Sequence, residues 1–505
     1  MDPDRPPSLA KAMWRRFAIA AVAIVALSAA TTSTAVLLEV DTAARIFDRE
    51  SIAIPGIKGA LDDVDPGGPQ TILLLGSDRR FADIATKAPT RSDTMILVRL
   101  DPSKGATALM ALPRDLKVEI PGHGTDRINA AYALGGPRLT VRTVRDLMSS
   151  VSETGSFPIH HVVNVNFGGF RRAVNRLGCV FADVDRDYFN DNNPPFGGGP
   201  NYATIDIDAG YQKLCGQDAL DYVRYRHFDS DLVRAARQQE FLRQAKEQVG
   251  VSKIFSDRKE LLRIFARYTQ TDIRGTEAIL RLLKLAVESA QNPVQEVQFP
   301  GEIKGDYVEA PPERLARAVQ RFMNAQSSPG RRGQERRRPT GSKPSKRSRS
   351  RARRAGLPPG MILNRNPNED LAVRLATKAS MPVVFPKAQL STASLLVDHS
   401  RAYTIKDRTG RGYKAFRMVF RTNEVGQYYG VQGTTWKSAP ILDQPSERRK
   451  MGGRRYELFF DGDRLRLVAW RTEKAVYWVS NTLLQTVSNK QMLALARSLT
   501  RIGAK

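Results

Sequence analysis

Two arginines close an apolar run within residues 222–239, a stretch that reads YVRYRHFDSDLVRAARQQ and contains no lysine. Arg224 and Arg226 stand two residues apart, so an extended strand would place both guanidinium groups on one face. Like charges held this close repel one another unless an anion lies among them. The planar guanidinium matches phosphate oxygens in a bidentate fashion that a lysine ammonium cannot reproduce. The stretch therefore favours a site that grips a phosphorylated ligand.

The second half of the same stretch has the spacing of a helix. Arg234, Arg237 and Gln238 follow an i, i+3, i+4 pattern, which places the three side chains on one helical face. Asp229 and Asp231 precede them, where a carboxylate suits the positive end of the helix dipole. The alternative is a solvated basic helix face crossed by Asp–Arg pairs, the usual fate of such runs. The apolar neighbours of the first two arginines favour a ligand site instead.

A second polar cluster lies upstream, at the ends of apolar runs. Asp78 follows the run TILLLGS, Arg91 and Asp93 open the run RSDTMILV, and Arg114 ends the run ALPR. Polar residues at the tips of buried strands are where ligands bind in α/β sheets. Asp78 and Asp93 beside two arginines would suit a Mg²⁺ ion that bridges phosphate oxygens. Each residue alone would more often belong to a turn or a helix cap, so the signal is their joint occurrence.

Alternating strands and helices must position these residues. Short apolar runs predict strands and longer periodic runs predict helices. The expected strands are 71–76, 94–100, 106–112, 161–165 and 180–184, and the expected helices are 137–148, 170–177 and 234–248. This alternation predicts a three-layer α/β/α domain with a central mixed sheet over residues 70–325.

The N-terminus sets the compartment. Residues 17–38 are uncharged, and a helix of this length spans roughly 30 Å, the thickness of the hydrocarbon core of a bilayer. Arg15 and Arg16 precede the stretch and Glu39 follows it, so the tail 1–16 is expected in the cytoplasm and the remainder outside. A cleaved signal peptide is the alternative, but the apolar stretch exceeds the usual signal core of roughly 7–15 residues.

The expected compartment bears on the state of the cysteines. The chain has two, Cys179 and Cys215. Outside the cytoplasm the surroundings are oxidising, and we expect these two residues to form a disulfide.

The rest of the chain divides by composition. Residues 39–69 resemble a juxtamembrane spacer, and residues 326–369 a disordered basic linker. Residues 331–354 alone carry +11 of the net charge of +27. Because the basic residues lie almost entirely after the expected membrane span, we predict no nucleic-acid partner. Residues 370–505 predict a small accessory α+β domain that ends in a helix at 490–499, capped by Ser488.

The order of motifs along the chain resembles a known family. The segments GSDRR, RSDTMILV, ALPRDLKVEIPGHGTDRINAAYALGGP, VNFGGF and QDALDYVRYRHFDSDLVRAARQQEFL are similar to those of the LytR-CpsA-Psr family of cell-wall enzymes. The resemblance runs from about residue 71 to residue 249. It implies an exported, membrane-tethered phosphotransferase that moves a glycopolymer from a polyprenyl-pyrophosphate carrier to peptidoglycan. Phosphoryl transfer needs positioning and charge neutralisation, which arginines and a metal ion supply.

The resemblance also implies roles for individual residues. Asp78 and Asp93 would hold the Mg²⁺ ion, and either Asp93 or Asp231 would act as the base on the acceptor hydroxyl. The implied catalytic residues are Asp93, Arg114, Arg226 and Asp231. The implied pyrophosphate ligands are Arg91, Arg114, Arg224, Arg226, Arg234, Arg237 and Gln238.

Two other functions fit the same residues. With water as the acceptor, the site would make the protein a polyprenyl-pyrophosphate or lipid-linked glycan hydrolase. With an inactive site, the protein would be a wall-binding scaffold.

Overall fold

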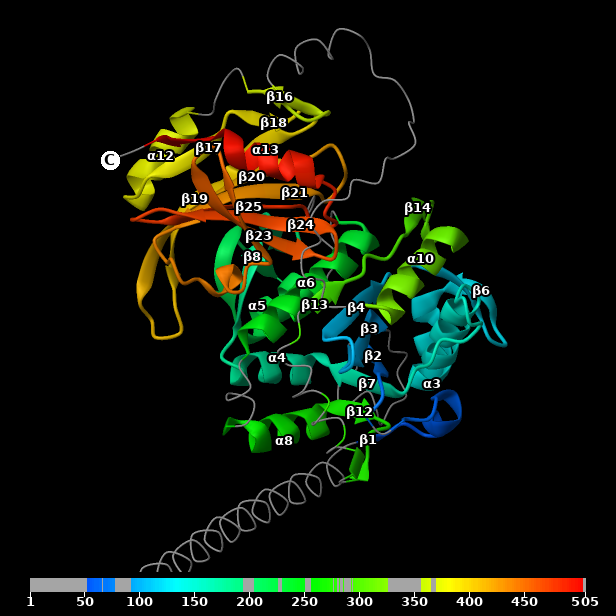
Figure 1. The fold of residues 1–505 in the computed structure, drawn as a ribbon. Helices are drawn as coiled ribbons and strands as arrows, with labels where there is room; N and C mark the ends of the chain where they lie inside the picture. The colour runs from blue at the N-terminus through cyan, green and yellow to red at the C-terminus, as the bar shows by residue number, and fades with distance from the viewer. Residues whose placement is uncertain are drawn as a thin grey trace, which may run out of the picture.

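Two seven-stranded sheets, one in each half of the chain, dominate the computed structural model (Figure 1). We call them the central sheet and the C-terminal sheet. The structure describes residues 52–65, 67–77, 92–193, 204–225, 229–249, 256–275, 277, 278, 281, 285, 292, 294–325, 356–364 and 369–502.

The central sheet is mixed, with the strand order β1-β12-β7-β2-β3-β4-β13. β2 pairs antiparallel with β3 and parallel with β7, and β3 pairs antiparallel with β4. This confirms the predicted α/β fold around a central mixed sheet. The strands are β1 (Ile52–Ala53), β2 (Gln70–Ser77), β3 (Ser92–Asp101), β4 (Ala106–Leu112), β7 (His161–Asn166), β12 (Thr269–Thr271) and β13 (Val294–Glu296).

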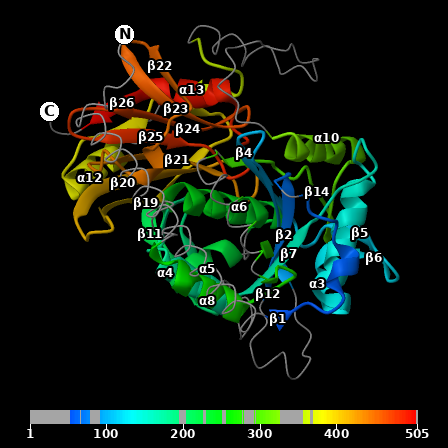
Figure 2. The ribbon, with the colours of Figure 1, turned by 60° about the horizontal axis from the view of Figure 1, so that its bottom comes forward.

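Helices cover both faces of the central sheet (Figure 2). On one face, Leu73 and Leu97 of the sheet share a core with α3 and α10. On the other face, Ile96 and Ala111 pack against Ala235 of α6. Ala266 of α8 packs against Ile72 and Val163 on the same face. Burial on both faces explains why these strands read as continuous apolar runs. The helices are α3 (Ile128–Ser149), α6 (Asp231–Gln248), α8 (Arg258–Tyr268) and α10 (Pro312–Met323).

Residues 52–60 belong to this folded unit. β1 pairs parallel with β12, and the short helix η1 (Ile57–Ala60) follows it. Ile54, Ile57 and Ala60 are buried in the core beside α3. The folded unit therefore begins before the predicted boundary at residue 70, because these apolar side chains complete one face of the central sheet. Short hairpins also border this face: β5 (Lys117–Ile120), β6 (Gly124–Arg127), β14 (Glu302–Lys304) and β15 (Tyr307–Glu309).

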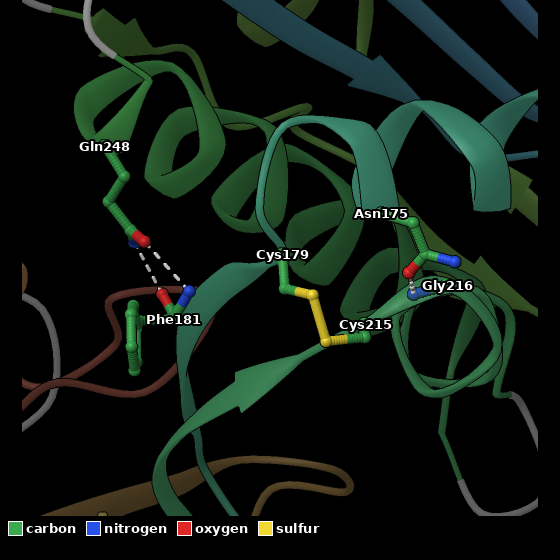
Figure 3. The surroundings of a disulfide bond; sticks show 6 residues. All are labelled: Asn175, Cys179, Phe181, Cys215, Gly216 and Gln248. Atoms are coloured by element: carbon green, nitrogen blue, oxygen red, sulfur yellow. Dashed lines mark hydrogen bonds between the residues drawn. A yellow bond between two sulfur atoms is a disulfide. The ribbon is translucent and has the colours of Figure 1, made fainter. Parts of the chain in front are cut away.

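A smaller layer stands between the two sheets, and we call it the disulfide layer. Cys179 and Cys215 are joined by a disulfide where β8 begins and β11 ends (Figure 3). Gln248 of α6 binds the backbone of Phe181 twice, accepting from its N–H over 2.8 Å and donating to its carbonyl oxygen over 2.6 Å. The layer is thereby fixed to α6. Its elements are α4 (Phe167–Arg176), β8 (Val180–Val184), β9 (Tyr188–Asn190), β10 (Ile205–Ile207), β11 (Gly210–Leu214) and α5 (Gly216–Arg224).

The C-terminal sheet is antiparallel throughout, with the strand order β19-β20-β21-β25-β24-β23-β22. Helices α12 and α13 cover one face. Ser488 caps α13, as the sequence predicted, and the structure shows that it does so in a capping box with Gln491. The elements are β16 (Met361–Leu363), α12 (Glu369–Ala379), β17 (Val383–Pro386), β18 (Ala388–Leu390), β19 (Ser394–Lys406), β20 (Gly412–Arg421), β21 (Tyr428–Thr434), η2 (Pro440–Leu442), β22 (Glu447–Met451), β23 (Arg454–Asp461), β24 (Arg464–Arg471), β25 (Val476–Ser480), α13 (Asn489–Ser498) and β26 (Leu499–Ile502).

The other face of the C-terminal sheet packs against the first half of the chain. Phe181 and Tyr211 of the disulfide layer share a buried cluster with Trp436 and Trp478. The ring centroids of Phe181 and Trp436 lie 5.0 Å apart, and those of Tyr211 and Trp478 lie 6.0 Å apart. The two halves of the described chain therefore share a core, whereas the sequence suggested an accessory domain set apart by a linker.

Three predicted segments lie wholly or largely outside the described residues. These are the cytoplasmic tail 1–16, the membrane span 17–38 and the basic linker 326–369, of which only 356–364 and Glu369 are described. Across the described ranges, no helix is both long enough and apolar enough to cross a membrane.

Candidate functional site

Four strand ends meet at one edge of the central sheet. β2 ends at Ser77, which lies opposite Ser92, the first residue of β3, and opposite Asn166, the last residue of β7. β4 ends at Leu112, which pairs with Met95 near the start of β3. The strand ends that the sequence predicted to carry the ligand site thus share one edge, which we call the site edge.

Several predicted site residues lie outside the described residues, although some of their sequence neighbours belong to the site edge. Asp78 directly follows β2 in the sequence, Arg91 directly precedes β3, and Arg226 lies in the segment 226–228. Asp93 is the second residue of β3, and its side chain is not among those described. The roles assigned to these four residues stay predictions.

A hydrogen bond joins the site edge to helix α6. The backbone N–H of Asp115, three residues after β4, donates to Oδ2 of Asp231 over 3.1 Å. Oδ1 of Asp231 accepts from Arg234, and the two side chains of this ion pair are only 2% and 4% exposed. The side chain of Ser230 caps the helix, so α6 begins at Asp231 with an acidic first residue. The clusters around Arg114 and Arg234, predicted from distant motifs, therefore meet.

Asp115 is a charged residue that the sequence reasoning left without a role. Its Oδ1 lies 3.6 Å from Nε of Arg114 and 3.8 Å from Nε of Arg127. Burial, followed by repulsion from Asp231, raises the pKa of Asp115, while the arginines around it oppose the shift. Two carboxylates thus alternate with Arg114, Arg127 and Arg234 at the site edge. The signal that could have found Asp115 is its place directly after Arg114 in the ALPRD motif.

Arg224 ends a helix, and the predicted strand shared with Arg226 is wrong for this residue. α5 extends to Arg224. Nε of Arg224 lies 3.0 Å from Oδ1 of Asp221, one turn earlier, and its guanidinium lies 5.8 Å from the ring centroid of Phe167. Because Phe167 directly follows β7, Arg224 stands at the site edge. The β-branched and aromatic residues before Arg224 favour a strand by propensity, and packing in the disulfide layer overrides that preference.

Arg237 and Gln238 project from α6 to the end of α5. Nη1 of Arg237 donates to the carbonyl oxygens of Tyr225, over 2.8 Å, and Tyr222, over 3.3 Å. Nε2 of Gln238 donates to the carbonyl oxygen of Val223 over 3.1 Å. The last turn of a helix leaves such carbonyls without intrahelical partners. The predicted helical face exists, and in this structure Arg237 and Gln238 hold the end of α5; their direct contact with a substrate stays a prediction.

Asp229 joins Arg237 to an arginine that the sequence gave no reason to select, Arg186. Oδ2 of Asp229 accepts from Arg237, and Oδ1 accepts from Nη2 of Arg186 over 2.7 Å. The side chains of Asp229 and Arg237 are fully buried. Tyr225 and Asp229 flank the segment 226–228, so this network holds both sides of the segment that contains Arg226. Arg186 follows a strand with no motif around it, so only tertiary structure reveals it.

The hydrogen bonds of Asp231 bear on its predicted role. Both of its carboxylate oxygens already accept, Oδ1 from Arg234 and Oδ2 from the Asp115 N–H. A general base needs an oxygen within hydrogen-bond reach of the proton that it takes. The contacts of Asp231 are those of a residue that positions Arg234.

The two residues predicted to bind a metal ion are not among the described side chains. Among the side chains that the structure describes, no three His, Cys, Asp or Glu residues stand close enough together to hold a metal ion. The predicted ligands, Asp78 and the side chain of Asp93, lie outside that set.

Several known proteins are similar to part of this chain. The chain is 32% identical over 238 residues to the polyisoprenyl-teichoic acid–peptidoglycan teichoic acid transferase TagU of Oceanobacillus iheyensis, covering 46% of this chain and 66% of that protein. It is 35% identical over 183 residues to TagT of Bacillus subtilis, covering 36% of this chain and 53% of that protein. The matched region thus spans between about half and two thirds of these relatives. A solved structure described as TagT bound to LI-WTA is 28% identical, with a TM-score of 0.40, covering 52% of this chain and 93% of that chain.

The family match spans the central sheet, the disulfide layer and the site edge. The LytR_cpsA_psr family model matches residues 36–324, which is more than half of the chain. It includes every motif that the sequence reasoning placed at the site, and it stops just after α10. This protein belongs to the LytR_cpsA_psr family.

Proposed function

We propose that this protein is a phosphotransferase that moves a glycopolymer from a polyprenyl-pyrophosphate carrier to peptidoglycan. The observation that carries the proposal is the hydrogen bond between Asp115 and Asp231, which brings the arginines of two distant motifs to one sheet edge. A cluster of guanidinium groups with Arg114, Arg224 and Arg234 suits a doubly charged diphosphate better than any neutral ligand. The names of the relatives, teichoic acid transferases acting from a polyisoprenyl carrier, support the same reaction.

In the proposed reaction, a hydroxyl of peptidoglycan attacks the phosphorus that bears the glycan. The new bond joins the acceptor oxygen to this phosphorus, the bond to the bridging oxygen breaks, and polyprenyl phosphate leaves with the electron pair. The proton of the acceptor hydroxyl passes to a carboxylate. Because both oxygens of Asp231 already accept hydrogen bonds, we assign this role to Asp93. Arg114, Arg224 and Arg226 would stabilise the charge that builds up on the phosphoryl oxygens.

A Mg²⁺ ion is part of the proposal. The pairing of Ser77 with Ser92 brings the end of β2 beside the start of β3, which supports Asp78 and Asp93 as a joint pair of oxygen ligands. Carboxylates that share a metal with substrate phosphates are a common arrangement for this ion. When bound, the ion would neutralise negative charge on the pyrophosphate.

The proposed location is the outer face of the cell membrane. Residues 17–38 would form a single anchor with residues 1–16 in the cytoplasm. The disulfide between Cys179 and Cys215 agrees with an oxidising compartment. Membrane attachment would keep the site near a lipid-linked donor that cannot leave the bilayer.

The test is a transfer assay on the full-length protein in detergent or vesicles. Lipid-linked oligosaccharide is supplied with and without peptidoglycan, and products are separated by mass. The proposal expects glycan attached to peptidoglycan and polyprenyl phosphate as the second product. Oligosaccharide phosphate made equally without peptidoglycan would identify a hydrolase instead, and no turnover in any arm would favour a binding scaffold.

A pair of arginine variants links the activity to the site. Arg224→Ala removes a partly exposed guanidinium at the site edge, and we expect kcat/KM to fall by roughly a hundredfold or more. Arg314→Ala removes an exposed guanidinium on α10 that pairs with Glu302, and it should leave the kinetics unchanged. Equal activity in the two variants would remove Arg224 from the proposed site.

A further inference from the structure

The C-terminal sheet contacts the strand segment that leads to the site. Arg417 of β20 is 1% exposed, and its Nη1 donates to Oδ1 of Asp183 in β8 over 2.6 Å. Its Nη2 donates to the carbonyl oxygen of Asp185 over 3.3 Å. Two residues later, Oδ2 of Asp187 lies 3.0 Å from Nδ1 of His399 in β19. Residues 183–187 of the disulfide layer are therefore held along one side by the C-terminal sheet.

Arg186 lies in the middle of that segment and faces both halves of the chain. Its guanidinium stands 4.4 Å from the ring centroid of Tyr188, 5.2 Å from that of Tyr225 and 5.3 Å from that of Tyr428. Tyr428 is the first residue of β21, so the C-terminal sheet provides one of the three rings. A desolvated guanidinium over aromatic faces is attracted by the ring quadrupoles. Tyr428 thus limits where the Arg186 side chain can lie.

Arg186 connects the ring of Tyr428 to Asp229. Nη2 of Arg186 binds Asp229, whose other oxygen accepts from Arg237. Arg237 in turn holds the carbonyl oxygens of Tyr222 and Tyr225. The charges of this buried chain alternate, so removing one member leaves a neighbour uncompensated.

A turn between two strands of the C-terminal sheet also contacts Asp229 and the start of α6. Gly426 lies between β20 and β21 with φ +71°, and a Cβ at this position would come within 3.0 Å of Cγ2 of Val233 and 3.3 Å of Oδ1 of Asp229. Val233 belongs to the first turn of α6, one residue before Arg234. The backbone of the turn therefore lies against the start of the helix that carries the predicted pyrophosphate ligands.

We infer that the C-terminal sheet positions the phosphate-binding residues of the site, through Tyr428 acting on Arg186 and through Gly426 acting on the start of α6. Arg186 and Tyr428 are positioning residues. This inference rests on the proposed function, because it assigns the C-terminal sheet a part in the same reaction. The sheet lies outside the region that the family match covers, residues 36–324, and its contribution is to fix Asp229 and the two ends of the segment around Arg226.

The first test compares two tyrosines of the C-terminal sheet. Tyr428→Ala removes the ring beside Arg186, whereas Tyr413→Ala removes a similarly half-buried ring that stacks on Trp436 instead. We expect Tyr428→Ala to lower kcat/KM and to weaken the binding of farnesyl pyrophosphate, measured by calorimetry with Mg²⁺, by roughly tenfold or more. Tyr413→Ala should retain both values, and Tyr428→Phe, which keeps the ring, should rescue both within about twofold.

The second test uses glycines and covers the case in which Tyr428→Ala does not fold. Gly426→Ala presses a methyl group against Val233 and Asp229, whereas Gly410→Ala has the same kind of positive φ, +89°, and meets no atom within 4 Å. Both variants have a strained turn, but only Gly426→Ala should lower kcat/KM. Hydrogen exchange of the peptide that covers residues 222–238 should speed up in Gly426→Ala and Tyr428→Ala and remain unchanged in the two controls.

The outcomes separate the two proposals. A wild-type protein that neither transfers glycan nor binds the pyrophosphate probe overturns the proposed function, and this inference falls with it. An active wild-type protein whose Tyr428→Ala and Gly426→Ala variants keep wild-type kinetics and exchange overturns this inference alone.

Discussion

The backbone N–H of Asp115 donates a 3.1 Å hydrogen bond to Oδ2 of Asp231, across 116 positions of sequence. This bond ties the end of β4 to the first turn of α6. The arginine beside Asp115 and the arginine one turn after Asp231 consequently face the same edge of the central sheet. The candidate site is therefore built from two segments that neither local spacing nor charge could have joined.

The ion pair beside that bond should matter strongly for stability. Asp231→Ala leaves Arg234 buried without its partner and removes the acceptor of the Asp115 N–H. Loss of one member of a buried pair costs about 3–5 kcal/mol, so the free energy of unfolding in urea should fall by about that amount. Asp306→Ala is the control, because the Asp306 side chain is 90% exposed and its ion pair with Arg127 is long. A similar effect in both variants would contradict the buried pair.

Two neighbouring glycines of the VNFGGF motif should differ in what they tolerate. A Cβ on Gly169 would lie 2.4 Å from Cβ of Tyr268 at the end of α8, whereas one on Gly168 would meet nothing closer than 3.3 Å. We expect Gly169→Ala to destabilise the protein by about 1–3 kcal/mol through overpacking. Gly168→Ala should be close to neutral, because a better helix former offsets the tighter contact. The urea unfolding midpoints of the two variants, measured at an unchanged m-value, check both expectations. Equal midpoints in Gly169→Ala and Gly168→Ala would contradict the packing of α4 on α8.

The disulfide should stabilise the layer that carries α5. Cys179 and Cys215 close a loop with a sequence separation of 36, for which the loss of chain entropy in the unfolded state amounts to about 3–4 kcal/mol. Replacing both cysteines by alanine should lower the free energy of unfolding by about this amount. Added reductant should shift the urea midpoint of the wild-type protein and leave that of the double variant unchanged. A wild-type midpoint that ignores reductant would speak against the bond.

The contact between β13 and β23 should make stability depend on pH. Asp461 accepts from the Glu296 N–H over 2.7 Å and from Nε2 of Gln485 over 2.8 Å. Burial raises the pKa of Asp461 from 3.8 to about 6. Because the folded value lies above the ordinary one, folding favours the protonated carboxyl, and this stabilisation is present below about pH 4 and lost as the pH rises through 6.

Asp461→Asn isolates that titration. The variant keeps a neutral side chain at every pH, so its free energy of unfolding minus that of the wild-type protein should increase between pH 4 and pH 7. Urea unfolding of both proteins at several pH values gives this difference directly. A difference that stays flat, or that decreases with pH, would show that folding does not raise the pKa of Asp461.

The sequence alone determined the elements with strong local signals. Apolar runs at 71–76, 94–100 and 106–112 became β2, β3 and β4 because both faces of the central sheet are covered. The periodic run from 234 to 248 lies in α6, and Ser488 caps α13. The motif order also identified the family, and the residues that flank these strands define a candidate site whose individual roles stay predictions. Each of these signals lies within a few residues of the feature that it predicts.

Only tertiary structure decided the rest. Arg224 ends a helix although its neighbours favour a strand, because packing in the disulfide layer outweighs propensity. The partners of Arg186 are Asp229 and Tyr428, which are distant from it in sequence. The core shared by Phe181 and Trp436 unites two halves that composition had separated. Contacts between distant residues depend on how the layers meet, and no local pattern of residue types contains that information.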